Sequence, residues 1–496
     1  MDSAAPTIDT AYGPVRGTSR DGVRAFLGIP YAAPPVGRAR FEAPRAPEPW
    51  TEPRDATTHG AAALQSPYPP PMDRLLPPSV SPPGDGDALT VSVWTPDGAD
   101  ELPVLVWIHG GAFVRGASSV ATYDGSAFAR DGVVLVSIQY RLGAAGFAVI
   151  DGAPTNRGLR DQVFALEWVR DNVAAFGGDP GSVTIMGESA GAMSVADLVA
   201  SPAVQGLFHR AICQSGAGIS VCTQQDARLP AAALAARLGV EPTIDALADV
   251  APADLLAAQN AVGLAVMLDP DPATWGASVI RAGLGVMTWF PCLDGDLVPA
   301  VPVAAIAAGS AAPLLTGTTS EEFRLFTVPS GLAGSITEEA LPAILGRFGF
   351  SAATFTAYAA ARPGASPGDV VVAMLTDAAF TVPMLDLAAA TTAAGQPAYV
   401  YEFGWPTTVS DLGACHALEL SFVFDTLPGG AAYLLTEDAP QPLADRMHAA
   451  WVAFARDGDP GWPAWRPDDG AVLRFNTPDE LVHDPRAAEI ALWRST

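Results

Sequence analysis

The feature that most constrains the fold is a serine placed between an expected strand and an expected helix. Residues 183–186 are largely apolar and mostly β-branched, which predicts a short buried strand, and residues 192–199 have the pattern of a helix. Gly-Glu-Ser-Ala-Gly at 187–191 joins them, and its small residues suit a sharp turn that lifts the side chain of Ser189 out of the sheet. The helix N-terminus adds a partial positive charge and free N–H groups where an oxyanion would develop. This arrangement predicts that Ser189 is a nucleophile.

Apolar segments along the chain predict further strands of the same sheet. They lie at residues 89–94, 103–108, 133–138, 312–317 and 398–403. The second and third are almost uninterrupted apolar runs, as expected for parallel strands that are covered on both faces. An amphipathic helix expected at residues 160–169 leads to the serine strand. Strands that alternate with helices in this way predict a doubly wound α/β core.

We expect one domain over residues 1–496, although length alone would suggest about three. Residues 222–290 are rich in Ala and Leu and carry almost no strand pattern, so we interpret them as a helical insertion that lies over the sheet. Residues 66–86 are Pro-rich and predict a surface loop. The last clear amphipathic helix is expected at residues 437–457.

Composition argues against several classes of partner. The formal net charge of −26 disfavours nucleic acid and anionic membrane surfaces, and no run reaches the ~18 apolar residues of a membrane span. Residues 1–6 have neither a basic nor an apolar region, so no signal peptide is expected. Four cysteines have neither metal-ligand nor disulfide spacing: Cys213, Cys222, Cys292 and Cys415. Free thiols without a signal peptide predict a cytoplasmic protein.

A serine nucleophile needs a histidine to take its proton and a carboxylate to orient that histidine. In known hydrolases that carry the serine on such a turn, the acid and the histidine both follow it in the chain. Three of the six histidines qualify: His416, His448 and His483. His448 lies in an expected helix and His483 in a charged segment near the end of the chain, whereas His416 occupies a loop after a strand, which makes it the candidate base. Glu321 and Glu322 both follow an expected strand, and spacing does not choose between them as the acid.

The segment His-Gly-Gly-Ala-Phe at 109–113 directly follows an expected strand. Glycines admit unusual dihedral angles, so such a loop can direct several main-chain N–H groups at one point. Together with the N–H group of Ala190 it would complete an oxyanion hole, in which each donor stabilises a transition state by ~3 kcal/mol. His109 is expected to brace the loop rather than to act as a base.

These motifs, in this order, resemble the carboxylesterase/cholinesterase (type B) family of α/β hydrolases, and in style its bacterial p-nitrobenzyl-esterase-like members. The resemblance covers nearly the whole chain. The segments that carry it are 26–32, 34–38, 89–96, 109–113, 140–143, 156–162, 176–180 and 187–191. It implies an α/β-hydrolase fold with a large, mostly parallel sheet, helices on both faces and a helical insertion over the active site.

The resemblance also implies roles for individual residues. Ser189 would be the nucleophile, Glu322 the acid and His416 the base. Glu188 and Ser215 match positions that border the family's triad and support it.

By the same resemblance, the oxyanion donors would be the N–H groups of Gly111, Ala112 and Ala190, with Gly110 shaping the turn. We expect a largely apolar substrate pocket beneath the helices of residues 222–290. Its expected lining residues are Phe113, Cys222, Trp289, Phe290 and Phe323.

Departures from the family pattern narrow the expectation. Ala88 stands where animal members carry a cysteine of a disulfide, which is consistent with a reducing compartment. No tryptophan lies between Trp50 and Trp94, so the aromatic platform that binds choline is missing and a choline-ester specialist is not expected. On an ungapped count from Ser215, Cys222 replaces a tryptophan common in the acyl pocket of cholinesterases.

The expected activity is hydrolysis of small-molecule carboxylic esters through an acyl-enzyme, without metal or cofactor. One alternative is the same triad acting on an amide, a carbamate or a lactone. A remote alternative is a non-catalytic binding module on the same fold, and the intact nucleophile, acid, base and oxyanion loop argue against it. Acyl and alcohol specificity depends on the shape of the pocket, which motifs do not encode. The oligomeric state, a monomer or a small homo-oligomer, is likewise left open by the sequence.

Overall fold

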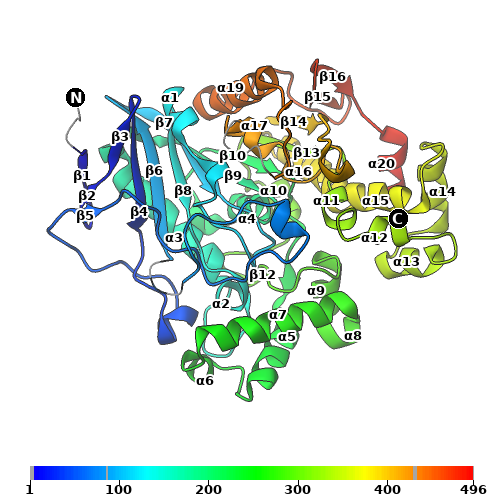
Figure 1. Ribbon diagram of the computed structural model, residues 1–496, viewed down its shortest axis with the longest axis horizontal. Coiled ribbons are helices and arrows are strands. Elements are labelled where there is room, and N and C mark those ends of the chain that lie inside the picture. Colours follow the sequence, from blue (N-terminus) through cyan, green and yellow to red (C-terminus); the bar gives the residue numbers. More distant parts are fainter. Residues whose placement is uncertain (1–4, 85, 87, 428–432, 495–496) are drawn as a thin grey trace.

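The computed structural model describes residues 5–84, 86, 88–427 and 433–494. Its centre is an 11-stranded sheet with the strand order β16-β15-β14-β13-β10-β9-β7-β8-β6-β4-β3 (Figure 1). The strands are β3 (Thr18–Arg20), β4 (Val23–Pro30), β6 (Thr90–Pro96), β7 (Leu102–Ile108), β8 (Val134–Ile138), β9 (Gly178–Glu188), β10 (Arg210–Gln214), β13 (Leu314–Thr319), β14 (Ala398–Phe403), β15 (Ala471–Phe475) and β16 (Glu480–His483). A small separate sheet contains β1 (Thr7–Thr10), β2 (Gly13–Arg16) and β5 (Arg54–Asp55).

The middle of the large sheet is parallel and its edges are antiparallel. Every neighbouring pair from β8 through β7, β9, β10, β13 and β14 to β15 is parallel. The outer pairs β15·β16, β6·β8, β4·β6 and β3·β4 are antiparallel. The predicted strands are therefore confirmed, and they form the mixed, mostly parallel sheet of an α/β protein.

The position of β7 in the sheet explains why its sequence is apolar throughout. Val104, Val106 and Ile108 belong to the core on one face of the sheet, and Leu105 and Trp107 belong to the core on the other. Side chains of a strand alternate between the two faces, so a strand with a core on each side needs apolar residues at every position. Of these five residues, none has any exposed surface.

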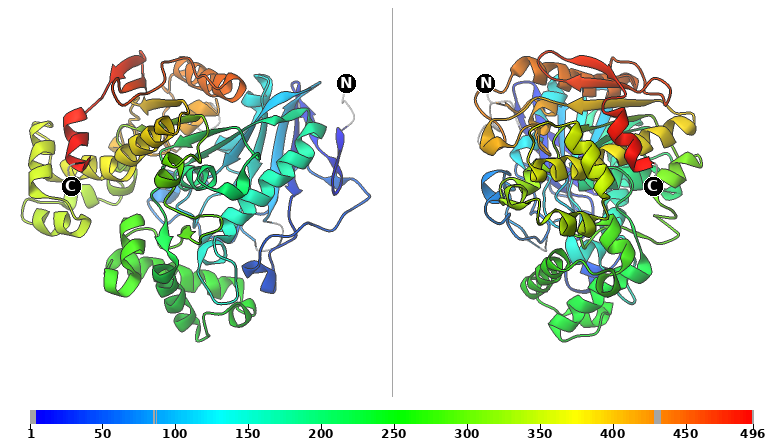
Figure 2. Two further views of the ribbon diagram at one scale, coloured as in Figure 1. Left: turned by 180° about the vertical axis from the view of Figure 1, so that it is seen from behind. Right: turned by 90° about the vertical axis from the view of Figure 1, so that its right-hand side faces the viewer.

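Helices cover both faces of the sheet. One face is covered by α3 (Arg157–Asn172), α4 (Ala190–Val199), α10 (Pro302–Ala307) and α16 (Val382–Ala393), and Figure 2 shows α3 lying across the strands. The other face is covered by α1 (Ser126–Arg130), α17 (Leu420–Val423) and α19 (Gln441–Asp457). The short helix α2 (Gly143–Phe147) packs against α3. A buried, two-bond ion pair of 2.6 and 2.8 Å joins Arg141, just before α2, to Asp161 of α3.

Two helical regions extend beyond the sheet, and both are visible in Figures 1 and 2. The first contains α5 (Gln224–Leu238), α6 (Ile244–Ala248), α7 (Pro252–Leu268), α8 (Pro272–Trp275) and α9 (Ala277–Ala282). Its entry strand β11 (Cys222–Thr223) pairs with its exit strand β12 (Cys292–Leu293), so both ends of the segment meet. The helical content predicted for residues 222–290 is observed, while the division of the chain into one domain with an insertion stays a prediction.

The second helical region was not foreseen from the sequence. It contains α11 (Arg324–Thr327), α12 (Leu332–Ser335), α13 (Leu341–Phe348), α14 (Ala352–Ala360) and α15 (Pro367–Thr376), and the chain ends on α20 (Ala487–Arg494), which contacts α14. From α15 a π-helix at Asp377–Thr381 leads into α16, giving one long helix. This run, Pro367–Ala393, is long and apolar enough to cross a membrane by length and composition, but 72% of its most apolar window is buried, as in the core helix of a folded domain.

The chain order of the central strands fixes where the site lies. From β7 the chain passes to β8 on one side and then returns to β9 on the other side. The loops after β7 and β9 therefore meet where the strand order reverses, which is where open α/β sheets bind ligands. The loops that follow β10, β13 and β14 open at the same edge, because these strands are parallel to β9.

Candidate active site

Ser189 sits on a strained turn between β9 and α4. Its backbone angles are φ 55° and ψ −124°, a left-handed conformation that costs a non-glycine residue about 1–3 kcal/mol. The turn is held because the Ser189 N–H group donates to the carbonyl of Gln214 at 2.9 Å. Gly191 is required for close packing, because a Cβ atom there would lie 2.0 Å from the carbonyl oxygen of Ile108. The expected strand–turn–helix arrangement is thus observed.

His416 lies between two carboxylates. Its Nδ1 atom is 2.5 Å from Oε2 of Glu322, and its Nε2 atom is 3.0 Å from Oε1 of Glu188. Burial by itself would lower the pKa of His416, but the two carboxylates raise it well above the ordinary value. Both carboxylates therefore favour the charged form of the ring over the neutral form. Nε2 of the ring thus pairs with Glu188, and the hydroxyl of Ser189 makes no hydrogen bond to any described residue.

The two adjacent glutamates, between which spacing alone did not choose, make different contacts. Glu322 is fully buried, and its second oxygen accepts the N–H group of Thr319 at 2.8 Å, which fixes the carboxylate against the ring of His416. Glu321 points the other way. Its carboxylate accepts the N–H group of Ala414, and its own N–H group donates to the carbonyl of Ala414, both at 2.9 Å. Glu321 therefore braces the backbone of the loop that carries His416.

A further buried carboxylate, Glu419, was not identified from the sequence. Gln214 donates to one of its oxygens at 3.1 Å, and Gln214 is held in turn by the indole N–H group of Trp451 at 3.0 Å. Burial, with the charges of Glu188 and Glu322, raises the pKa of Glu419 to about 8. Its position three residues after His416 is the only sequence signal that could have pointed to it.

The glycine-rich loop after β7 lies directly against the serine. A Cβ atom on Gly110 would be 2.6 Å from Oε2 of Glu188 and 3.0 Å from the Cβ atom of Ser189. Gly111 has φ 114° and Ala112 has φ 54°, so the backbone turns through conformations outside the common regions. In the described chain the N–H groups of these two residues donate to no protein acceptor, which leaves them free for an anion.

His109 braces this loop as expected. Its Nδ1 atom donates to the carbonyl of Gly110 at 2.9 Å, and its ring stacks on Tyr140 at 4.6 Å between ring centroids. The Tyr140 hydroxyl donates to the carbonyl of His109 at 2.8 Å. Burial lowers the pKa of His109 to about 4, so the ring is neutral at pH 7.

Gln65, just before the Pro-rich segment, and Tyr68 within it both contact the chain after the glycine-rich loop. The side-chain amide of Gln65 accepts from the N–H group of Gly116 at 2.9 Å and donates to its carbonyl at 2.8 Å. The Cζ atom of Arg115 lies 5.7 Å from the centroid of the Tyr68 ring. Burial raises the pKa of Tyr68 to about 12. Gln65 thus holds the backbone just after the glycine-rich loop. Neither the periodicity of the sequence nor its motifs predicted this contact.

Aromatic rings surround the imidazole of His416. Phe326 and Phe380 lie 5.1 and 5.0 Å from it, centroid to centroid, and Phe323 packs against both at 5.4 and 5.8 Å. Phe326 is also 42% exposed, so it reaches from the histidine to the surface. Of the expected pocket residues, only Phe323 contacts these rings.

The other expected pocket residues are buried. Phe113 is fully buried, and its ring packs edge-on against Phe147 at 4.9 Å. Cys222, Trp289 and Phe290 are each 2% exposed. Their role as pocket lining stays a prediction.

Ser215 has a left-handed backbone, with φ 49°, next to the serine turn. Its N–H group donates to the carbonyl of Gly317, and its buried hydroxyl has no partner among the described residues.

The other titratable candidates have structural surroundings. His448 is buried in α19 and bonds the carbonyl of Val423 at 2.7 Å, and His483 is exposed and pairs with Asp469. All four cysteines are free and buried, as expected. No group of three or more metal-ligating side chains occurs among the described residues.

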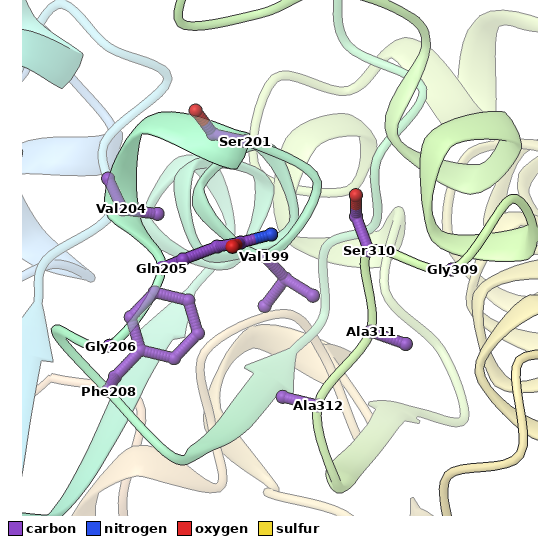
Figure 3. A pocket seen from close by; sticks show the side chains of 10 residues that line it. All are labelled: Val199, Ser201, Val204, Gln205, Gly206, Phe208, Gly309, Ser310, Ala311 and Ala312. Carbon is purple, nitrogen blue, oxygen red and sulfur yellow. The ribbon is translucent and has the colours of Figure 1, made fainter.

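Two cavities lie outside this constellation. One of about 210 Å³ is shown in Figure 3, between the end of α4 with Gln205 and Phe208 and the segment at 309–312. It lies about 15 Å along α4 from Ser189 and has no titratable lining residue. The other, of about 280 Å³, adjoins Ser320 and Glu321, and its three arginines are engaged by carboxylates: Arg362, Arg474 and Arg486.

A large, mostly parallel sheet with a serine on a strained turn after a central strand defines an α/β hydrolase. Comparison with known proteins gives the family. The family model described as "Carboxylesterase family" matches residues 4–493, and the chain belongs to this family as a type B carboxylesterase.

Individual relatives are similar over nearly their whole length. The para-nitrobenzyl esterase of Bacillus subtilis is 38% identical over 97% of this chain and 96% of its own, and the phenmedipham hydrolase of Pseudarthrobacter oxydans is 36% identical over 94% of each. Among solved structures, a Geobacillus stearothermophilus carboxylesterase matches with a TM-score of 0.85 and 35% identity, covering 98% of this chain and 99% of that chain. A p-nitrobenzyl esterase structure matches with a TM-score of 0.81.

Proposed function

We propose that the chain hydrolyses carboxylic esters through a Ser189–His416–Glu322 triad and an acyl-enzyme intermediate. His416 takes the proton of Ser189 as its Oγ attacks the ester carbonyl, and it then protonates the departing alcohol. Water activated by the same ring attacks the acyl-enzyme, and the acid leaves as Ser189 regains its proton. Glu322 holds the tautomer with Nδ1 protonated and balances the imidazolium charge.

One observation carries this proposal. A buried carboxylate lies 2.5 Å from Nδ1 of a histidine whose other nitrogen faces the residue just before the strained serine. A general base needs a carboxylate that orients its ring, and Glu322 is placed to do this, while the far nitrogen pairs with Glu188 in the resting structure. For Nε2 to take the proton of Ser189, the ring has to break its contact with Glu188.

The oxyanion of the tetrahedral intermediate would be held by the N–H groups of Gly111, Ala112 and Ala190. The free N–H groups of the glycine-rich loop and the first N–H group of α4 support this assignment, and Gly110 allows the loop to approach the serine. A Cβ atom at position 110 would leave no room for this approach.

Glu188 and Ser215 would support the triad from either side of the serine. Glu188 contacts the imidazole directly, and the Ser215 N–H group ties the strand ends of β10 and β13 together. We propose a supporting electrostatic role for Glu188 and a structural role for Ser215.

Small-molecule esters are the proposed substrates, and an amide, carbamate or lactone would use the same groups. Initial rates on matched ester and amide substrates separate these alternatives, and we expect the ester to turn over faster. A cytoplasmic location stays a prediction from the sequence.

The test is the initial rate on p-nitrophenyl butyrate for the wild type and for Ser189→Ala at neutral pH. We expect the folded variant to lose about a thousandfold or more in kcat. Equal and high rates would show that another residue is the nucleophile. Equal, near-background rates would remove the support for this ester as a substrate.

A further inference from the structure

Arg324 joins three segments of the candidate site without touching the reacting atoms. It is the first residue of α11, two positions after Glu322, and its side chain is only 14% exposed. Its guanidinium contacts Asp411, 87 positions later in the chain, and Asp369, 45 positions later. Neither link follows from a family motif quoted above or from local periodicity.

The first link reaches the loop that carries His416. Nε and Nη2 of Arg324 donate to the carbonyl of Asp411 at 3.2 and 2.5 Å, and Nη2 also donates to its carboxylate at 2.9 Å. Ser410 and Asp411 both have left-handed backbones, with φ 49° and 57°. Such conformations persist in non-glycine residues only where their surroundings hold them.

The second link reaches the helix that leads to Phe380. Nη1 of Arg324 donates to the carboxylate of Asp369 at 3.2 Å, in the first turn of α15. That helix continues into the π-helix at Asp377–Thr381, which brings the Phe380 ring to 5.0 Å from the imidazole of His416. One guanidinium is therefore connected to the loop that bears the histidine and to the helix that packs against its ring.

The carbonyl of Asp411 is the stronger part of the first link. The Asp411 side chain is 95% exposed, so its ion pair with Arg324 is screened by water and contributes little. The carbonyl bonds use two N–H groups of a planar fork, which fixes direction as well as distance. A lysine keeps the charge but cannot make this forked contact.

We propose that Arg324 is a positioning residue that sets the placement of the His416 loop against Glu322 and Glu188. This inference rests on the proposed function of His416 as the base. The guanidinium acts through the backbone of residues 410–416 and through α15, and it contacts no substrate.

The test compares Arg324→Met with Arg446→Met. Arg446 of α19 is the control, since none of its hydrogen bonds reaches a residue of the candidate site. It also makes a forked contact, to Asp479 at 2.6 and 2.8 Å, and bonds two carbonyls, of Pro442 and Asn476, at 2.7 and 2.9 Å. We expect Arg324→Met to lower kcat on p-nitrophenyl butyrate about 30-fold with KM within about threefold, because misplacement of catalytic groups by ~1 Å costs about a hundredfold. Arg446→Met is expected to keep kcat within twofold at a comparable loss of melting temperature.

The pH profile distinguishes positioning from loss of stability. Two carboxylates contact His416, Glu188 from β9 and Glu322 after β13, and the buried carboxylate of Glu419 interacts with it through charge alone. If the loop moves away from Glu188 and Glu322, their raising effect on the pKa weakens, and the acid limb of kcat/KM moves to lower pH. Simple destabilisation would reduce activity without moving that limb.

Two further variants complete the test. Asp411→Asn keeps the carbonyl acceptor and is expected to stay within threefold of wild-type kcat, and Arg324→Lys is expected to recover only part of the activity lost in Arg324→Met. Arg324→Lys also decides the matter if Arg324→Met does not fold, since full activity with an unmoved acid limb would overturn the proposal. A loss in Arg324→Met no greater than in Arg446→Met would overturn it as well. An inactive wild type would instead contradict the proposed function, which Ser189→Ala tests separately.

Discussion

The serine side and the histidine side of the candidate site are built in different ways. The serine side is one continuous segment, in which β9, the turn and α4 follow each other within residues 178–199. The histidine side is assembled from Glu321 and Glu322 after β13, the loop that ends at His416, and the helix with Phe380. The first is held by backbone geometry and the second by side chains from distant parts of the chain.

This difference has a physical origin. A turn between a central strand and its helix is fixed by the packing of both elements, and small residues are needed where backbones approach closely. A long loop has no such restraint, so its ordering must be stabilised by hydrogen bonds to other segments. Glu321, Gln65 and Arg324 all bond backbone groups of loops near the site. Apart from the nucleophile Ser189 itself, we therefore expect substitutions on the serine side to affect mainly folding and those on the histidine side to affect mainly catalysis.

The largest effect is expected from Glu322→Gln on the histidine side. The amide can present its N–H group to Nδ1 and favour the wrong tautomer, so kcat should fall about 10³–10⁴-fold with little change in stability. Steady-state kinetics with p-nitrophenyl butyrate and a thermal melt measure both quantities. Glu321→Gln is the matched control and should lose only about tenfold, because it braces the loop without contacting the imidazole. Equal losses in the two variants would show that the adjacent glutamates are not distinct.

On the serine side, we expect substitutions to destabilise the fold by disturbing the packing. In Gly191→Ala the new Cβ atom would lie 2.0 Å from the Ile108 carbonyl, so α4 must move away from β7. We expect a loss of about 3 kcal/mol or more in the free energy of unfolding, measured by urea denaturation. Gly346→Ala is the control, since a Cβ atom in that helix meets nothing within 4 Å, and it should be neutral or slightly stabilising. A Gly191→Ala variant as stable as Gly346→Ala would contradict the packing argument.

The smallest effect is expected at Glu188, which belongs to the serine segment and also contacts His416 on the histidine side. The Glu188 carboxylate helps to raise the pKa of His416, and a base must be neutral to act. Activity of the wild type is therefore lost as the pH falls through this raised pKa. Glu188→Gln should lower the pKa, so that the acid limb of kcat/KM shifts to lower pH while the plateau above it falls about tenfold or less. An unmoved limb in the pH–rate profile would mean that Glu188 does not influence the base.

Much of the fold could be predicted from local sequence. The apolar runs at 103–108 and 133–138 are strands in the parallel part of the sheet, and the serine turn has the expected strand before it and helix after it. The helices at residues 222–290 were also foreseen. Such elements are encoded locally because burial on one or both faces requires a short-range pattern of apolar residues.

The second helical region was missed for the same reason. Its short helices α11, α12 and α13 have four, four and eight residues, too few to show a clear helical period. The π-helix that presents Phe380 is a local departure from helical geometry, which no period of the sequence signals.

The sequence by itself determined the α/β sheet, the serine on its turn, the glycine-rich loop and the histidine at 416, because each is a local pattern of residue types. Spacing did not choose between Glu321 and Glu322, and only the family resemblance pointed to Glu322 and Glu188. The tertiary structure alone showed the contacts of these glutamates with His416, the buried Glu419, and the hydrogen bonds by which Arg324 and Gln65 hold the loops. These relations join residues tens to hundreds of positions apart. They depend on which strand ends lie side by side and on the direction of each side chain, and neither is encoded in a local pattern.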